Sequence, residues 1–177
     1  MQNNKIVIFF LIKFFGTYAL LFLLYSFFLS KNQNTIDVFE CDSITEHVAK
    51  KSNFVIRILG YNSEIIQSTN ELSYQVIIDN KPIARVIEGC NAMSIIILFI
   101  SFIVAFSKRF KPTLVFILVG SLLIYFINIF RIGVITIALY KFPQHQYLLH
   151  DILFPALIYG FTFLLWILWV SKFSKQY

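Results

Sequence analysis

Charged residues are scarce in this sequence. Asp, Glu, Lys and Arg together make up 14% of its 177 residues, whereas hydrophobic residues make up 58%. A soluble globular domain contains about 25% charged and about 45–50% apolar residues. These proportions exclude an ordinary soluble domain and predict an integral membrane protein. The net charge of +6 comes from basic residues spread among loops, which favours an asymmetric membrane topology over a nucleic-acid-binding surface.

Cysteine is also rare. Cys41 and Cys90 are too few for a disulfide framework, although one bond between them is compatible with an oxidising compartment. The sequence has no C-x-x-C pair, no H-E-x-x-H helix and no glycine-rich phosphate loop. This argues against a zinc protease, a kinase or an NTPase, and we expect neither a metal nor a cofactor.

The sequence has instead four apolar runs, at residues 6–29, 92–106, 113–139 and 150–170. A bilayer-spanning helix needs about 20 apolar residues, so we predict about four transmembrane helices. A cleaved signal peptide is the alternative for the first run, which has a basic start at Lys5. However, that run is longer than a usual h-region of about 7–15 residues, and no A-x-A-like site follows it. We expect a retained anchor at residues 1–29.

The segment at residues 30–88 differs in composition, because it holds eight of the nine acidic residues. Residues 35–51 have the pattern of a short amphipathic helix with Thr35 as its N-cap. Residues 54–59 have the pattern of a strand. The turn-rich residues 79–82 separate two further apolar stretches, 72–78 and 83–87, which predicts a β-hairpin.

So small a segment buries little core, and we expect it to lean on the membrane domain or the lipid surface. The expected fold is therefore an all-α polytopic membrane protein of about four transmembrane helices. A small mixed α/β extracytoplasmic segment lies between the first and second, and residues 89–177 form the membrane core.

Basic residues mark one side of the membrane. They gather at the N-terminus, between the second and third runs and at the C-terminus, with no acidic residue among them: Lys5, Lys108, Arg109, Lys111, Lys172 and Lys175. With four spans these regions share one side, which the positive-inside rule makes cytoplasmic. We therefore expect a bacterial inner-membrane protein with cytoplasmic termini. The acidic segment and residues 140–149 would face the periplasm.

Three chemically notable side chains fall near that outer face. Cys90 begins the second run, His150 begins the fourth, and Arg131 lies about eight residues, or roughly 12 Å, before the outer end of the third. A thiol beside cations is a potential nucleophile, and an imidazole transfers protons near neutral pH. The fixed donors of an arginine can stabilise an oxyanion. Together the three predict an acyl-transfer site.

Each of these residues also has a plainer interpretation. Cys90 would then be a small apolar residue that packs in the interior, and His150 would be a histidine at the membrane interface. Arg131 is costly inside a bilayer unless it faces protein or water, snorkels outwards, or pairs with an acid such as Asp151 or Glu88.

Other polar residues nearby have supporting roles in this hypothesis. Asn128, one helical turn before Arg131, would orient the guanidinium or help to pack the helices. Glu88 would adjust the local charge or simply end a solvated strand. Gly89 would allow a tight turn from strand to helix. Cys41 and His47 are expected to be ordinary surface or packing residues.

The ordered segments Glu88-Gly89-Cys90-Asn91-Ala92-Met93, Asn128-Ile129-Phe130-Arg131-Ile132 and His150-Asp151 resemble the exosortase/archaeosortase family. The similarity is greatest to its short, exosortase F-like members and covers approximately residues 85–170. It implies a polytopic membrane cysteine enzyme whose partners are membrane-anchored substrates with C-terminal sorting signals. Such a signal has a short motif, a transmembrane helix and a basic cytoplasmic tail.

The resemblance also implies a role for each matching residue. Cys90 would be the nucleophile that forms a thioester, Arg131 would position the substrate and stabilise the transition state, and His150 would transfer the proton. Two features depart from the family pattern. Many exosortases have more spans, and many have Ser-Gly or a similar small pair where this chain has Asn91-Ala92.

The expected function is therefore that of a membrane cysteine transpeptidase or endopeptidase. The sequence leaves its recognition motif and its acceptor molecule open. One alternative is a non-enzymatic scaffold or envelope assembly factor whose outer segment binds a partner. Another is a redox protein in which Cys41 and Cys90 form a disulfide.

Overall fold

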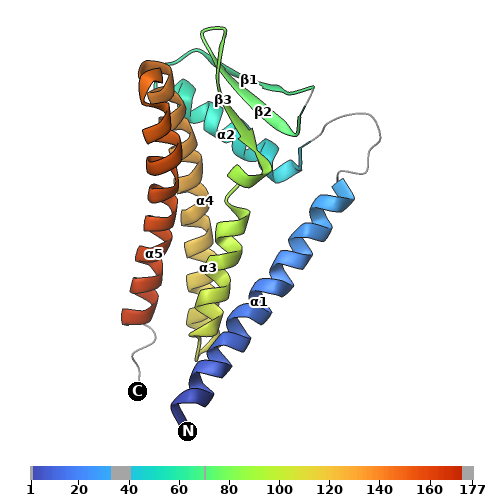
Figure 1. The fold of residues 1–177 in the computed structure, drawn as a ribbon, viewed down its shortest axis with the longest axis vertical. Coiled ribbons are helices and arrows are strands. Elements are labelled where there is room, and N and C mark those ends of the chain that lie inside the picture. Colours follow the sequence, from blue (N-terminus) through green and yellow to red (C-terminus); the bar gives the residue numbers. More distant parts are fainter. Residues whose placement is uncertain (1, 33–40, 70, 173–177) are drawn as a thin grey trace.

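The computed structural model describes residues 2–32, 41–69 and 71–172, most of which are helical. Helix α1 (Gln2–Asn32) runs along a bundle formed by α3 (Met93–Ala105), α4 (Phe110–Lys141) and α5 (Phe154–Lys172). Helix α2 (Ser43–Ile58) and a three-stranded sheet lie across one end of this bundle, here called the sheet end (Figure 1). Helix α1 begins and α5 ends at the opposite end. The basic turn that joins α3 to α4 also lies there, and we call it the basic end.

Three segments are long and apolar enough to cross a membrane: Val7–Lys31, Phe110–Lys141 and Leu148–Lys172. The second predicted run forms α3, whose 13 residues rise only about 20 Å, against a hydrocarbon thickness of about 30 Å. The prediction of a helical, multi-pass membrane protein with a small mixed α/β segment is confirmed. Its second helix is shorter than a full span.

The sheet is antiparallel and has the order β1-β2-β3, with β1 at Ser63–Gln67, β2 at Ser73–Ile78 and β3 at Lys81–Ile87. Asp79 and Asn80, with φ of 47° and 61°, form the two-residue turn between β2 and β3. Asp and Asn tolerate this left-handed conformation, which the tight hairpin turn requires. The predicted hairpin is confirmed, whereas β1 was not anticipated.

The predicted strand at residues 54–59 is wrong, because these residues continue a helix. Helix α2 begins after Asp42, whose Oδ1 accepts the N–H groups of Ile44 at 2.8 Å and Thr45 at 3.1 Å. The β-branched residues near its end resemble a strand locally, but its buried side chains recur every three or four positions: Thr45, Val48, Ala49, Ser52 and Ile56. The expected cap Thr35 lies outside the described residues.

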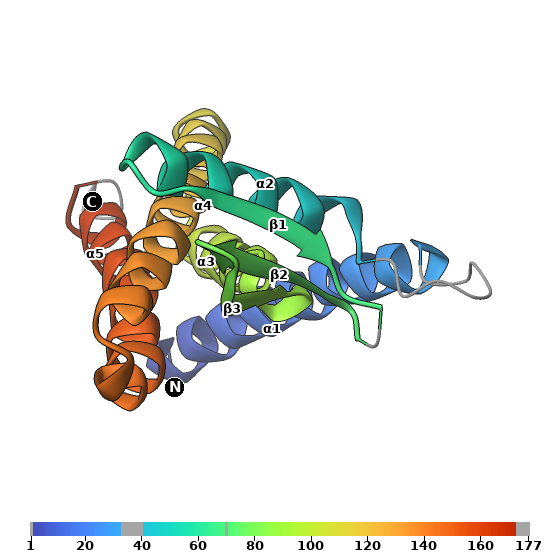
Figure 2. The same cartoon turned by 90° about the horizontal axis from the view of Figure 1, so that it is seen from above.

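Helix α2 and the sheet pack directly on the membrane helices, as expected for so small a segment. Figure 2 shows α2 and β1 lying across the end of the bundle. Val48 of α2, Val76 of β2 and Ile132 of α4 belong to one buried apolar cluster. Gly133 of α4 allows close approach, since a Cβ there would lie 3.0 Å from Val55 of α2.

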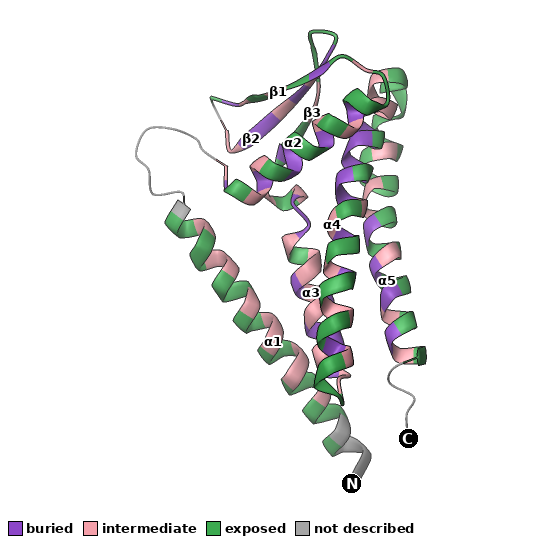
Figure 3. Cartoon of the chain, turned by 180° about the vertical axis from the view of Figure 1, so that it is seen from behind, coloured by how far each residue is buried: buried purple, intermediate pink, exposed green. Residues whose placement is uncertain are grey.

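A second buried cluster lies closer to the basic end of the bundle and joins α3, α4 and α5 through Phe99, Ile124 and Ile158. Helix α1 contributes none of its span to the interior, and exposed and half-exposed residues cover it (Figure 3). It packs beside α3, where the rings of Phe10 and Phe106 lie 4.7 Å apart.

Candidate functional site

Strand β3 leads into the candidate site. It is followed by a 3-10 turn, η1 (Glu88–Cys90), and then by Asn91 and Ala92 before α3 begins. Ala92 has φ 65° and ψ 1°, so the left-handed residue of this connection is Ala92 and not Gly89. The expected conformational role of Gly89 is therefore wrong: its φ is not positive, and a Cβ there would meet only Ile87, at 3.9 Å.

Asn91 fastens this connection to its surroundings. Its Oδ1 accepts the Met93 N–H at 3.0 Å and so satisfies a free donor at the start of α3. Its Nδ2 donates to the Tyr25 hydroxyl of α1 at 2.6 Å and to Thr45 Oγ1 of α2 at 3.1 Å. One buried amide thus joins three helices immediately after the cysteine.

Asn128 fixes the main chain of Cys90. Its Nδ2 donates to the Cys90 carbonyl at 2.7 Å, so it connects α4 to the cysteine turn and does not orient Arg131. Of its two expected roles, helix packing is the one observed. Asn128 follows Phe110 by 18 residues, which is about 27 Å along α4. Cys90 therefore lies at the sheet end, nearly a full hydrocarbon thickness from the basic turn.

Arg131 is buried, with 5% of its surface exposed. Its Nη1 donates to the Phe154 carbonyl at 3.1 Å, and its guanidinium lies 3.6 Å from the centroid of the Phe154 ring. The Cys90 thiol is close enough to interact with its charge. Its Nε is buried and has no hydrogen-bond partner among the residues that the structure describes. It therefore neither snorkels nor bonds to Asp151.

His150 lies in a π-helical turn, η3 (Leu148–Leu153), just before α5. Its Nδ1 is 2.8 Å from Asp151 Oδ1, and its ring stacks with that of Phe154 at a centroid distance of 5.6 Å. A carboxylate at Nδ1 holds a histidine in the tautomer that leaves Nε2 free for proton transfer. The imidazole is largely exposed, with 64% of its side chain accessible.

Pro155 supplies a physical reason for the π-helical turn. Proline has no N–H, and its ring collides with the carbonyl four residues earlier in a regular helix. The wider turn avoids this collision, and the Phe154 N–H bonds to the carbonyl of Leu149, five residues back.

Phe154 is the site residue that the sequence did not reveal. Its carbonyl and ring hold Arg131, and the same ring stacks with His150. The spacing of four residues from His150 to Phe154 matches one helical face. In a chain with 21 phenylalanines, that spacing alone does not single it out.

A cavity of about 660 Å³ opens between β3 and α4. Cys90, His150 and Phe154 all line it. Arg131 and Asn128 do not line it: Arg131 is held against Phe154, and Asn128 against the main chain of Cys90. The structure thus brings two of the three predicted residues to one cavity and places the third beside its wall.

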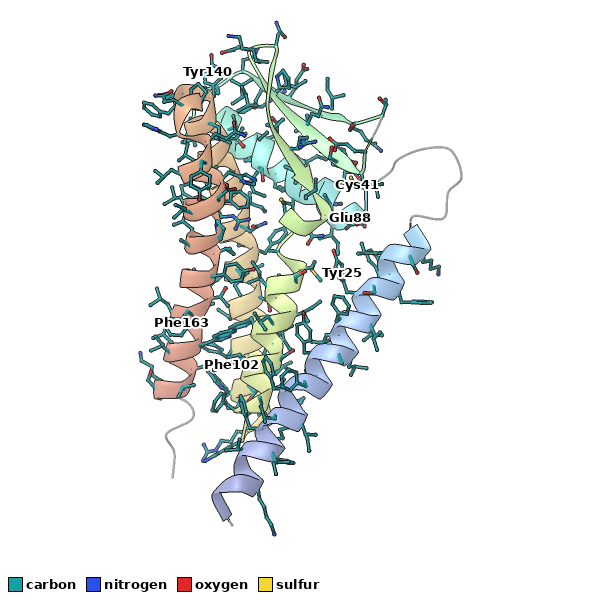
Figure 4. The ribbon with its side chains drawn as sticks, viewed as in Figure 1. Tyr25, Cys41, Glu88, Phe102, Tyr140 and Phe163 are labelled. Atoms are coloured by element: carbon teal, nitrogen blue, oxygen red, sulfur yellow. The ribbon has the colours of Figure 1, made fainter. Side chains whose placement is uncertain are left out.

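The second cysteine lies at the same junction but in a different setting. Cys41 is near Glu88, where β3 meets η1 (Figure 4). Burial, together with the negative charges of Glu88 and Asp42, raises the pKa of the Cys41 thiol to about 11. Both cysteines are free. Within residues 2–32, 41–69 and 71–172, no three His, Cys, Asp or Glu side chains are grouped as metal ligands.

Comparison with known proteins extends the resemblance beyond the second half of the chain. The model of the transmembrane exosortase family matches residues 6–170. No curated protein and no solved structure matches the chain. The family match therefore covers α1, α2 and the sheet as well as the cysteine turn and the helices that follow.

Proposed function

Because the chain belongs to the transmembrane exosortase family, we propose that it is a membrane cysteine transpeptidase or endopeptidase acting on C-terminal sorting signals. One observation carries this proposal: Cys90 shares a cavity with His150 and lies within electrostatic reach of Arg131. A nucleophile, a proton acceptor and a fixed positive charge are the components of an acyl-transfer site.

In the proposed reaction, His150 Nε2 takes the proton of the Cys90 thiol while Asp151 holds Nδ1. The thiolate attacks the scissile carbonyl, a C–S bond forms and the carbonyl oxygen becomes an oxyanion. The intermediate then collapses, the C–N bond breaks and the protonated His150 gives its proton to the leaving amine. A thioester on Cys90 remains, and an acceptor amine or water attacks it and releases the thiol.

Arg131 stabilises the oxyanion in this scheme. It lies within electrostatic range of Cys90, and its buried Nε lacks a partner among the described residues. An unsatisfied buried donor costs about 1–3 kcal/mol. A negative charge that develops nearby only in the transition state would recover that cost and so accelerate the reaction.

The proposed orientation follows from charge. The turn with Lys108, Arg109 and Lys111 lies at the basic end, which we assign to the cytoplasm of a bacterial inner membrane. The sheet end then faces the periplasm, with Cys90 near the outer boundary of the hydrocarbon. This depth suits a substrate whose cleavage motif immediately precedes its transmembrane helix.

The test needs a substrate from the same genome. A reporter would carry the last residues of an exported protein that ends in a short motif, a transmembrane helix and a basic tail. Processing would be measured by the change in reporter size when it is co-expressed with each variant. We expect Cys90→Ala, Arg131→Ala and His150→Ala each to abolish processing without lowering the amount of enzyme in the membrane.

His145→Ala is the matched control for His150→Ala, because His145 is exposed and does not line the cavity. We expect it to process the reporter as the wild type does. If all three alanine variants process normally, the enzyme proposal is wrong and a scaffold role is favoured.

A further inference from the structure

One wall of the cavity is the edge of strand β3. All six consecutive residues from Pro82 to Ile87 line it. Side chains alternate between the two faces of a strand, so a face would contribute only every second residue. The cavity must therefore border the edge of the strand, where the main chain is accessible. Residues at helical spacing on α4 also line the cavity: Ile132, Ile135, Thr136 and Leu139.

Some main-chain N–H and C=O groups of β3 point outwards at this edge, away from β2. The Ser73 carbonyl accepts the Ser68 N–H at 2.9 Å, so the polar main-chain groups of Ser73 face away from β3. Ser73 is the partner of Ile87 in β3, and this pair therefore lacks the two hydrogen bonds of a bonded pair. Bonded and non-bonded pairs alternate along an antiparallel ladder. Ile87 and Arg85 accordingly point their N–H and C=O groups away from β2.

No strand pairs with this side of β3 in the part of the chain that the structure describes. Native sheets usually block such edges with proline, bulges or charge. The first half of β3 does so, with Pro82, which has no N–H, and a register shift opposite Val76 and Ile77. The second half, Ala84 to Ile87, has neither a proline nor a bulge, and its one charged residue, Arg85, is paired with Glu71. That open half ends three residues before Cys90.

We propose that the recognition motif of the substrate binds as an extended strand along Ala84–Ile87 of β3, with its scissile carbonyl at Cys90. This inference rests on the proposed function. The occupant is the stretch of substrate that immediately precedes its transmembrane helix. Such a stretch runs from the periplasm towards the membrane, as β3 does on its way to α3, so the added strand is parallel to β3 (Figure 1).

In strand addition, the affinity for the substrate and the selectivity for its motif come from different groups of the enzyme. Hydrogen bonds to Arg85 and Ile87 bind any extended main chain, while the cavity walls select alternate side chains. The wall from α4 is apolar apart from Thr136, so it favours an apolar side chain. On the other side, Arg85 Nη1 donates to both carboxylate oxygens of Glu71 at 2.9 Å, and both residues line the cavity. This ion pair favours a polar motif residue.

Photocrosslinking tests whether the substrate lies along β3. A photoreactive amino acid would replace Ile87 in β3 or, as the matched control, Ile66 in the other edge strand, β1. The two isoleucines are similarly exposed, at 46% and 50%. The background is Cys90→Ala, so that bound reporter is not consumed. We expect a crosslinked adduct from position 87 and none from position 66. Equal adducts from both positions, or none from either, would overturn the inference.

Proline substitution tests the main-chain contact itself. Ile87→Pro removes an N–H that points away from β2 and leaves the pairing of β2 with β3 intact. We expect it to reduce reporter processing at least about tenfold, the value of roughly one lost hydrogen bond of 1.4 kcal/mol. Ile87→Ala keeps the N–H and should lose less. Ile65→Pro is the control, because Ile65 occupies the equivalent non-bonded position in β1; we expect processing per molecule to match the wild type.

The labelling rate of Cys90 with iodoacetamide shows whether Ile87→Pro has displaced the cysteine turn. An unchanged rate with reduced processing supports strand addition. Normal processing by Ile87→Pro would refute strand addition and leave the proposed function standing. Failure of the proposed function is recognised separately, because the wild type and Cys90→Ala would then give the same reporter pattern.

Discussion

The two ends of the same helical bundle bury different kinds of side chain. At the sheet end the interior contains Asn91, Asn128 and Arg131, exposed by 1%, 0% and 5%. At the basic end the buried side chains are apolar, and partly buried aromatic rings pack against them: Phe102 stacks on Trp166 at 4.3 Å, and Phe116 lies beside the buried Trp169 at 4.9 Å. Figure 4 shows Phe102 well below the junction marked by Glu88.

The buried polar groups at the two ends also differ in their partners. Ser101, near the basic end, and Thr162, in the middle of α5, bond to carbonyls four residues earlier in their own helices, as Thr136 does near the sheet end. At the sheet end, Asn91 and Asn128 bond to other elements of the fold. Burying polar groups is costly unless each is satisfied, so networks between elements rigidify one arrangement. We therefore expect the basic end to serve mainly stability, and the sheet end to hold the proposed reactive groups in place.

The largest expected effect is at Cys90. Cys90→Ser should reduce reporter processing by at least about 10³-fold, because a hydroxyl is a much poorer nucleophile than a thiol at the same position. The amount of protein in the membrane should not change. If the serine variant processes the reporter nearly as well as the wild type, Cys90 is not the nucleophile, and the proposed difference in function between the sheet end and the basic end is wrong.

The next effect distinguishes two arginines, one at each end. Arg131→Lys keeps the charge but loses the planar donors that reach the Phe154 carbonyl, and we expect about a 10²-fold loss of processing. Arg109→Lys, in the basic turn, preserves the positive charge that sets topology and should process normally. Similar losses in both would mean that overall charge, and not the geometry at the sheet end, controls activity.

A third substitution should affect stability rather than chemistry. A Cβ at Gly120 would lie 2.3 Å from Phe99, whose ring is fully buried at the basic end. Gly120→Ala should destabilise the bundle by about 1–3 kcal/mol through overpacking. Less protein should remain in the membrane after heating, with unchanged processing per folded molecule. Gly160→Ala, where a Cβ meets nothing within 4 Å, is the control and should not destabilise.

The smallest effect concerns the connection after Cys90. Ala92 adopts the left-handed conformation that costs a non-glycine residue about 1 kcal/mol or more. Ala92→Gly should therefore raise the thermal midpoint slightly, whereas Ala105→Gly, in helix α3, should lower it. A lower midpoint for Ala92→Gly would show that the strain is absent.

The sequence predicts those features of the fold that depend on local composition and on the order of segments along the chain. Apolar runs and basic loops predicted that Cys90 and His150 lie at the same end, and the tight turn at Asp79-Asn80 predicted the hairpin. Sequence reasoning mistook residues 54–59 for a strand, because local β propensity was overridden by one buried helical stripe on α2. It also missed Phe154, since stacking between neighbouring helices leaves no mark in a single sequence.

The roles of Asn128 and Asn91 show the same limit. Spacing placed Asn128 one turn from Arg131, but its partner is the Cys90 carbonyl, 38 positions earlier in the chain. Asn91 bonds to Tyr25, 66 positions away. Contacts over such separations follow from how helices pack, and periodicity predicts only which face a residue occupies.

The most direct test is to trap the acyl intermediate with hydroxylamine. Purified protein would be incubated with the sorting-signal reporter, with and without hydroxylamine, and analysed by intact mass and by peptide mapping. We predict a reporter adduct on Cys90 and none on Cys41, which does not line the cavity and whose thiol is a weaker acid because its pKa is raised to about 11. Hydroxylamine should cleave the thioester, returning the free thiol and a reporter hydroxamate. Cleavage of the reporter without any adduct on Cys90, and at the same rate in Cys90→Ala, would contradict the account.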